Sequence, residues 1–418
     1  MTRVKTETPL APSAAPLARL APPAAAPGWL WDVFCQVIDN HGDVGVCWRL
    51  ARELAAHGQR VRLWLDDARA LPWLAPGAQA GGFERIEVRP WPRPGELARL
   101  PRADVWVEAF GCDITAAIGA ETASAPGFAP ESVARNAVWT RLPADLPDLP
   151  DSPPVWINLE YLSAEDWVPR MHALPSPVLH GPMQGAGKWF FYPGFGPGTG
   201  GLLREADLPA RHARFERRAW LAAHGVRWQG EPLASLFCYE PATLPALLAQ
   251  MGQARWHALV TPGRATLAVQ QALAALAEAA RPRITFLPHL PQPAYDELLW
   301  ACDVNFVRGE DSLVRALWAA WLARRAFVWH IYPQHDGAHH AKLHAFLRRT
   351  QASASLLDFH CAWNDLPHAP PLRLPAAPEL ARWQAAQHAA AADLATRPDL
   401  AAQLIAFVKE KKHAPAPT

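Results

Sequence analysis

The sequence predicts an α/β protein made of two sequential Rossmann-like halves, each of roughly 180 residues. Three observations support this fold class. A strand, a glycine-containing loop, a helix and a strand follow one another over residues 29–39, 40–45, 46–57 and 60–65, which is how a parallel sheet with covering helices begins. The same alternation returns in the second half of the chain. Finally, 418 residues, 50% of them hydrophobic, can fill two cores.

The first half is predicted to span residues 28–208, after an Ala/Pro-rich extension at 1–27 that we expect to be disordered. Its first helix is predicted because apolar residues recur at helical spacing from Cys47 to Leu54. Gly58 then stands where a helix-ending glycine belongs. Further strands are expected at 85–88, 104–109 and 155–159, irregular connections at 116–154, and an ordered Gly/Pro-rich loop at 188–201.

The second half is predicted to span residues 209–378 and repeats the alternation of strands and helices. Strands are expected at 234–239, 256–260, 283–287, 304–307 and 327–331. Helices are expected at 211–224, 245–252, 265–280, 295–301 and 312–322, with residues 308–311 as a loop.

Composition narrows the classes of function. Lys and Arg number 40 against 39 Asp and Glu, a net charge of +1, which argues against a generally basic nucleic-acid-binding protein. The sequence has neither a run of about 18 apolar residues nor a secretory signal pattern, so we expect no transmembrane helix and a cytoplasmic location. The six cysteines are scattered without metal-binding spacing and are expected to be reduced thiols.

The loop 39–45 is the first candidate site, because it links a strand to a helix where parallel sheets bind ligands. It contains Asp39, Asn40, Gly42 and Asp43. It thus places two carboxylates, four residues apart, at the edge of the sheet. In the alternative interpretation, Asp39 ties the loop and Asp43 caps the helix. The glycines do not match a dinucleotide-binding motif.

Residues 308–312 form the second candidate site, at the equivalent junction in the second half. A helix N-terminus offers free N–H groups to a phosphate, and Arg308 can add a bidentate contact. Alternatively, Asp311 or Ser312 is an N-cap and Glu310 is a solvated acid. Histidines gather around His340, but no carboxylate or thiol completes a convincing set of ligands, so we predict no metal site.

Several long blocks of this sequence resemble one family. FCQVIDNHGDVGVCWRLAREL, WINLEYLSAEDWV, LPSP, PGFGPGTGGLLRE, VRGEDSLVRALWA and FVWHIYPQ occur in that order between about residues 31 and 408. Together they are similar to the bacterial elongation factor P arginine rhamnosyltransferases, EarP. The resemblance implies a GT-B glycosyltransferase fold, in which two Rossmann-like domains face a cleft. It also implies that a C-terminal helix, here 379–410, completes the first domain.

The same resemblance implies the reaction and its partners. The donor would be TDP-β-L-rhamnose, held by the second domain, and the acceptor would be an arginine of elongation factor P. The rhamnose would be transferred with inversion at its anomeric carbon. Asp43 would be the general base, Asp39 its partner or a clamp for the acceptor guanidinium, and Glu310 a further catalytic residue. The implied donor-binding residues are Phe237, Tyr239, Gln292, Tyr295, Arg308, Glu310, Asp311 and Ser312. His289 departs from the pattern, because the family suggests phenylalanine there.

Inversion needs a single displacement and one base. A carboxylate cannot deprotonate a free arginine in advance, since the pKa of its guanidinium exceeds about 12, but it can orient the group and take the proton late. We expect no cofactor and no metal, because helix N–H groups and Arg308 can stabilise the leaving diphosphate. Two alternatives stay open: a GT-B enzyme with a small-molecule or lipid-linked acceptor, and a non-catalytic protein that binds nucleotide sugars.

Overall fold

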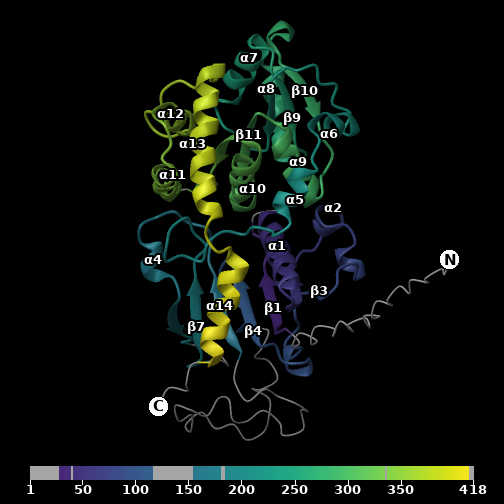
Figure 1. Ribbon diagram of the computed structural model, residues 1–418, viewed down its shortest axis with the longest axis vertical. Helices are drawn as coiled ribbons and strands as arrows, with labels where there is room; N and C mark the ends of the chain where they lie inside the picture. Colours follow the sequence, from purple (N-terminus) through teal and green to yellow (C-terminus); the bar gives the residue numbers. More distant parts are fainter. Residues whose placement is uncertain (1–27, 39–40, 116–153, 180–183, 335–336, 414–418) are drawn as a thin grey trace, which may run out of the picture.

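The computed structural model describes residues 28–38, 41–115, 154–179, 184–334 and 337–413. Two α/β domains lie one above the other along the long axis of the molecule (Figure 1). The expected extension at 1–27 and most of the expected irregular connection at 116–154 lie outside the described residues.

The first domain is built on a seven-stranded sheet in the order β3-β2-β1-β4-β5-β7-β6. The chain runs through β1 (Leu30–Cys35), α1 (Gly42–Ala56), β2 (Arg60–Leu65), α2 (Leu71–Leu74), β3 (Ile86–Pro90), β4 (Val105–Ala109), β5 (Val155–Leu159), α4 (Val168–Met171), β6 (Leu174–Pro177) and β7 (Gly187–Phe191). Every neighbouring pair is parallel except β6 with β7. The order reverses beside β1, the position at which open parallel sheets bind ligands.

The second domain has a five-stranded parallel sheet in the order β10-β9-β8-β11-β12. Its strands are β8 (Leu233–Leu236), β9 (His257–Val260), β10 (Arg283–Phe286), β11 (Val304–Arg308) and β12 (Ala326–His330). Its helices are α5 (Leu208–Ala213), α6 (Arg217–Ala223), α7 (Leu244–Gln253), α8 (Arg264–Ala274), α9 (Gln292–Ala301), α10 (Gly309–Ala323), α11 (Ala338–Arg349) and α12 (Ala354–Trp363). Here the order reverses between β8 and β11, so Arg308 at the end of β11 lies at the switch point.

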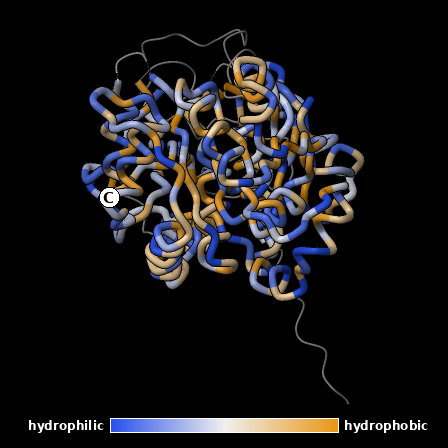
Figure 2. The backbone as a smooth tube through the Cα atoms, turned by 90° about the horizontal axis from the view of Figure 1, so that it is seen from above, coloured by the Kyte–Doolittle hydropathy of each residue, from blue (hydrophilic) through white to orange (hydrophobic). Residues whose placement is uncertain are grey.

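Hydrophobic side chains fill the interior of each domain, and several strongly hydrophobic stretches run through the middle of the view in Figure 2. Two C-terminal helices take part. α13 (Ala377–Ala395) places Trp383 and Ala391 in the cores of the second domain, whereas α14 (Leu400–His413) places Leu404 and Phe407 in the core of the first. Figure 1 shows the two yellow helices following one another down the molecule. No helix in the described part of the chain has the length and apolar character that crossing a membrane requires.

The prediction of one C-terminal helix over 379–410 was wrong, because the helix is interrupted between α13 and α14. Pro398 lies in the break, and proline disfavours helical backbone in the residue before it. The helix predicted at 211–224 is likewise two helices, α5 and α6, and the one at 265–280 already ends at Ala274. Residues 188–201 begin with strand rather than loop, since β7 occupies Gly187–Phe191.

Both predicted loops at the candidate sites were partly wrong. Helix α1 begins at Gly42 and α10 at Gly309, earlier than the sequence pattern indicated. Gly309 has φ +69°, a conformation that a side chain would make costly, and this lets the helix start directly after β11. Asp43, Glu310 and Asp311 in the first turns suit the positive end of the helix dipole. Neither helix has a side-chain N-cap, so the capping roles considered for Asp43, Asp311 and Ser312 were also wrong.

The buried side of α14 provides a test of its role in the first domain. Leu404→Ala should lower the free energy of unfolding by about 2–5 kcal/mol, the usual cost of removing a fully buried leucine side chain. Ile405→Ala, on the next and only partly buried residue, should cost less. Urea denaturation of the two variants measures the difference; equal losses would contradict the packing of α14 on this core.

Candidate functional site

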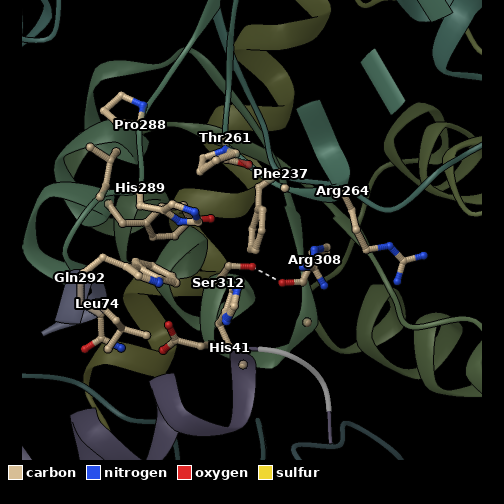
Figure 3. A pocket seen from close by; sticks show the side chains of 18 of the residues that line it. His41, Leu74, Phe237, Thr261, Arg264, Pro288, His289, Gln292, Arg308 and Ser312 are labelled. Atoms are coloured by element: carbon tan, nitrogen blue, oxygen red, sulfur yellow. Dashed lines mark hydrogen bonds between the residues drawn. The ribbon is translucent and has the colours of Figure 1, made fainter. Parts of the chain in front are cut away.

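A pocket opens between the two domains, at the ends of the strands in both sheets (Figure 3). The first domain contributes side chains from the start of α1 and from α2, and the second domain contributes the rest. The lining residues are His41, Gly42, Trp73, Leu74, Phe237, Thr261, Pro262, Gly263, Arg264, Pro288, His289, Leu290, Gln292, Tyr295, Arg308, Gly309, Glu310, Asp311 and Ser312. Most of the predicted donor-binding residues are therefore brought together by the fold.

Arg308 lies at the end of β11, directly before α10. Its guanidinium carbon lies 4.6 Å from the ring centroids of both Phe237 and Tyr239, which follow β8. Phe237 lines the pocket, whereas Tyr239 is 2% exposed and lies behind the arginine. Cation–π contacts hold a guanidinium in a defined plane. Arg308 and the N–H groups at the start of α10 are suited to a phosphate group, and Glu310 and Asp311 lie in the same first turn.

Three further predicted residues surround the first turn of α10. The Ser312 hydroxyl donates to the Arg308 carbonyl, as the dashed line in Figure 3 shows. The Tyr295 ring meets Phe237 edge-on at 5.9 Å, and burial raises the pKa of the Tyr295 hydroxyl, so it stays protonated. Gln292 reaches the other domain, because its Nε2 donates to the Gly45 carbonyl at 2.9 Å. Gln292 therefore contacts the helix that carries Asp43.

Both acids of α10 already have partners. Glu310 accepts a hydrogen bond from the Leu162 N–H at 2.7 Å and pairs with Lys342 at 3.1 Å. Burial raises the pKa of Glu310, while Lys342 acts in the opposite direction. Asp311 pairs with Arg49 of α1 at 2.9 Å. Burial likewise raises the pKa of Asp311, and Arg49 opposes the rise. Glu310 is thus a pocket carboxylate tied to the first domain, and the Arg49 partner of Asp311 was not foreseen.

Asp43 lies in the first turn of α1, next to Gly42 in the pocket wall. Its Oδ2 accepts a hydrogen bond from the Ile38 N–H at 2.8 Å, and the residue is 5% exposed. The loop-tying contact that the sequence analysis considered for Asp39 is therefore made by Asp43. Asp39 and Asn40 lie outside the described residues. The charge of Asp43 is one of the smaller causes that raise the pKa of Glu310, after burial.

An aromatic group that the sequence analysis missed closes one end of the pocket. The rings of Trp73 and His289 lie 4.4 Å apart, and the His41 ring lies 4.9 Å from Trp73. His289 therefore packs against a side chain from the other domain. The turn at Thr261–Arg264 was also missed. Its signal was the Thr-Pro-Gly sequence directly after β9, which marks the end of another strand at the same edge of the sheet.

A buried ion cluster lies beside the pocket, where the domains meet. Three arginines, Arg49, Arg211 and Arg315, pair with Glu205, Asp296 and Asp311. The Arg49 guanidinium contacts all three carboxylates, at 2.7 Å, 3.2 Å and 2.9 Å respectively. Burial acts to raise the pKa of Glu205, but Arg315 and Arg49 outweigh it and hold that pKa below its ordinary value. The cluster is balanced in charge, which buried ions require.

Within the part of the chain that the structure describes, no group of three or more His, Cys, Asp or Glu side chains is placed so that it could hold a metal ion. The cysteines within the same residues are free thiols, most of them buried.

Comparison with known proteins gives a consistent result. The family model described as Elongation-Factor P (EF-P) rhamnosyltransferase EarP matches residues 31–409. A protein-arginine rhamnosyltransferase of Pseudomonas aeruginosa is 41% identical over 409 residues, with 90% of this chain and 98% of the relative covered. One from Neisseria meningitidis serogroup B is 33% identical over 335 residues, covering 75% of this chain and 77% of the relative.

A solved structure that describes the structural basis for EarP-mediated arginine glycosylation of translation elongation factor EF-P is similar in fold. Its TM-score is 0.54 at 29% identity, with 91% of this chain and 99% of that chain covered. Two Rossmann-like domains that face a pocket are the GT-B glycosyltransferase arrangement, so the predicted fold class is confirmed.

Glu53 on α1 gives the interface a testable dependence on pH. Burial, and next the charge of Glu205, raises the pKa of Glu53 to about 7 from 4.5. The folded protein thus holds this proton more tightly than the unfolded chain, and stability falls as the pH rises between these two values. Glu53→Gln should therefore raise the melting temperature at about pH 8 and change it little at about pH 4.5. Glu84→Gln, at a carboxylate 89% exposed, is the control, and an unchanged melting temperature for Glu53→Gln at the higher pH would contradict this reading.

Proposed function

Because the chain belongs to the EarP family of elongation factor P (EF-P) rhamnosyltransferases, we propose that it transfers L-rhamnose from TDP-β-L-rhamnose to an arginine side chain of EF-P, with inversion at the anomeric carbon. The observation that carries the proposal is the pocket between the domains. One wall holds Arg308 and the first turn of α10, and the opposite wall holds the first turn of α1 beside Asp43. Activity on EF-P would take place in the cytoplasm, where translation factors act.

The second domain is suited to the donor. The diphosphate would lie against the N–H groups of α10, with Arg308, Arg264 and the Ser312 hydroxyl around it. Phe237, Tyr295 and Gln292 form the adjoining wall, and they would hold the nucleoside together with His289. Arg308, Arg264 and the N–H groups of α10 supply positive charge where the leaving diphosphate develops negative charge. We therefore propose that transfer needs no metal ion and no cofactor.

The first domain would present the acceptor. One guanidinium nitrogen attacks the anomeric carbon from the face opposite the diphosphate, the carbon–oxygen bond to the diphosphate breaks, and TDP leaves. Asp43 takes the proton that the nitrogen loses, while Asp39 and Glu310 orient the planar guanidinium. Carboxylates that orient the guanidinium suit this nucleophile, because a carboxylate cannot deprotonate arginine before the attack.

The decisive test is to incubate the chain with TDP-β-L-rhamnose and purified EF-P and to measure the intact mass of EF-P. A gain of one deoxyhexose that persists in excess EDTA supports the proposal. EF-P with its accepting arginine changed to lysine is the control and should gain nothing. Hydrolysis of the donor without modification of EF-P would point instead to a small-molecule or lipid-linked acceptor, and binding without turnover to a non-catalytic role.

Arg308→Lys tests the donor wall. Lysine keeps the charge but cannot lie as a planar fork between Phe237 and Tyr239. We expect the affinity for TDP, measured by titration calorimetry, to fall about tenfold, equivalent to about 1.4 kcal/mol. Arg324→Lys, at the exposed far end of α10, is the matched control. Unchanged TDP affinity in Arg308→Lys would remove Arg308 from the donor site.

Asp43→Asn tests the general base. Asparagine keeps an oxygen that can accept the Ile38 N–H, so the fold and TDP affinity should survive while the single-turnover rate falls at least about 100-fold. Asp66→Asn is the matched control, because Asp66 ties the same loop through the Val37 N–H at 2.9 Å. Asp39→Asn should act more on acceptor binding. A less stable but fully active Asp43→Asn enzyme would show that Asp43 only ties the loop.

A further inference from the structure

Arg49 lies on α1, two turns beyond Asp43, and is 3% exposed. It does not line the pocket. Its guanidinium nevertheless uses every one of its nitrogens outside its own helix: Nη1 pairs with Glu205 at 2.7 Å, Nη2 with Asp296 at 3.2 Å and Nε with Asp311 at 2.9 Å. A single side chain of the first domain therefore contacts two helices of the second, α9 through a hydrogen bond to Asp296 and α10 through an ion pair with Asp311.

The Asp311 contact matters most, because Asp311 lies in the first turn of α10. That turn also carries Glu310 and follows Arg308 directly. One ion pair thus connects the helix that begins beside Asp43 with the helix that begins at the proposed diphosphate position. Helices are stiff, so fixing them against each other fixes their N-terminal turns as well.

A second contact runs parallel to this ion pair. The Gly45 carbonyl accepts the hydrogen bond from Gln292 of α9, and a Cβ at Gly45 would lie 3.5 Å from the Asp311 Oδ2, which is an ordinary van der Waals distance. Helix α1 is thus held to the second domain at two levels, to α9 at Gly45 and to both α9 and α10 at Arg49.

We propose that Arg49 is a positioning residue for the transfer reaction, which holds the acceptor-side turn of α1 and the donor-side turn of α10 at a fixed separation. This inference rests on the proposed function. It assigns Asp311 a role through Arg49. The Asp311 carboxylate would fix the position of the first turn of α10 relative to α1, in addition to any contact with the donor. Misplacement of reacting groups by about 1 Å can cost about 100-fold in rate, so a residue outside the pocket can control turnover.

Arg49→Lys and Arg49→Met test the proposal against a purely structural role. Lysine keeps the charge, but its single ammonium group can contact fewer of the three carboxylates than a guanidinium does. Methionine removes the charge. Arg62→Lys is the matched control, because Arg62 forms a buried two-bond pair with Asp32 inside the first domain, at 2.6 Å and 2.7 Å. For each variant, three quantities are measured: the melting temperature, the TDP affinity, and the single-turnover rate with TDP-β-L-rhamnose and EF-P both saturating.

We expect Arg49→Lys to reduce the saturated rate about tenfold or more, with TDP affinity within about twofold, and Arg49→Met to reduce the rate further. Arg62→Lys should lose stability but transfer at the wild-type rate. Because Arg49 and Asp311 act as one contact, adding Asp311→Asn to Arg49→Lys should cost less than the two single effects combined. A folded Arg49→Lys enzyme with a normal saturated rate would overturn the inference, as would full additivity with Asp311→Asn. A wild-type chain that leaves EF-P unmodified would instead overturn the proposed function, and this inference with it.

Discussion

A buried cluster of arginines and carboxylates joins the two domains beside the pocket, and the geometry of the pocket depends on it. Arg49, Arg315 and Arg211 face Glu205, Asp296 and Asp311 with little exposure to water. In such surroundings each charge must be matched, since removing one partner leaves another buried and uncompensated. The cluster therefore defines one relative position of the domains, and a purely apolar contact between smooth helix faces would not define it so narrowly.

The chemistry follows from that position. Each sheet places a helix N-terminus at its strand-order switch point, and residues from both N-termini line one pocket beside the cluster. The wall at α10 is positively polarised through its N–H groups and Arg308, which suits a diphosphate. Next to the wall at α1 lies Asp43, whose carboxylate suits a cationic acceptor. A sugar held between them would meet a leaving group on one face and a nucleophile on the other, as inversion requires.

The sequence alone predicted most strands and the donor-wall residues, but it missed the starts of two helices and the contacts between the domains. Strands β2 and β5 match their predicted bounds, because strongly apolar runs between turn residues leave little choice. Donor-wall residues such as Phe237, Gln292 and Arg308 do line the pocket, as the family resemblance implied. The starts of α1 and α10 were placed too late, because acidic first turns resemble loops in sequence. The ion cluster was not foreseen: Arg49 lies 156 positions from Glu205 and 247 from Asp296, and no local pattern links residues so far apart. The packing of Trp73 on His289 was missed for the same reason.

A crystal structure of the chain with EF-P and TDP tests the central claim most directly, because it shows both walls of the pocket occupied at once. The account predicts the diphosphate at the first turn of α10 beside Arg308, the Arg49–Asp311 pair intact, and a guanidinium nitrogen of the accepting arginine within about 3 Å of the Asp43 carboxylate. An acceptor nitrogen out of hydrogen-bonding reach of Asp43, or a diphosphate bound away from α10, would contradict it.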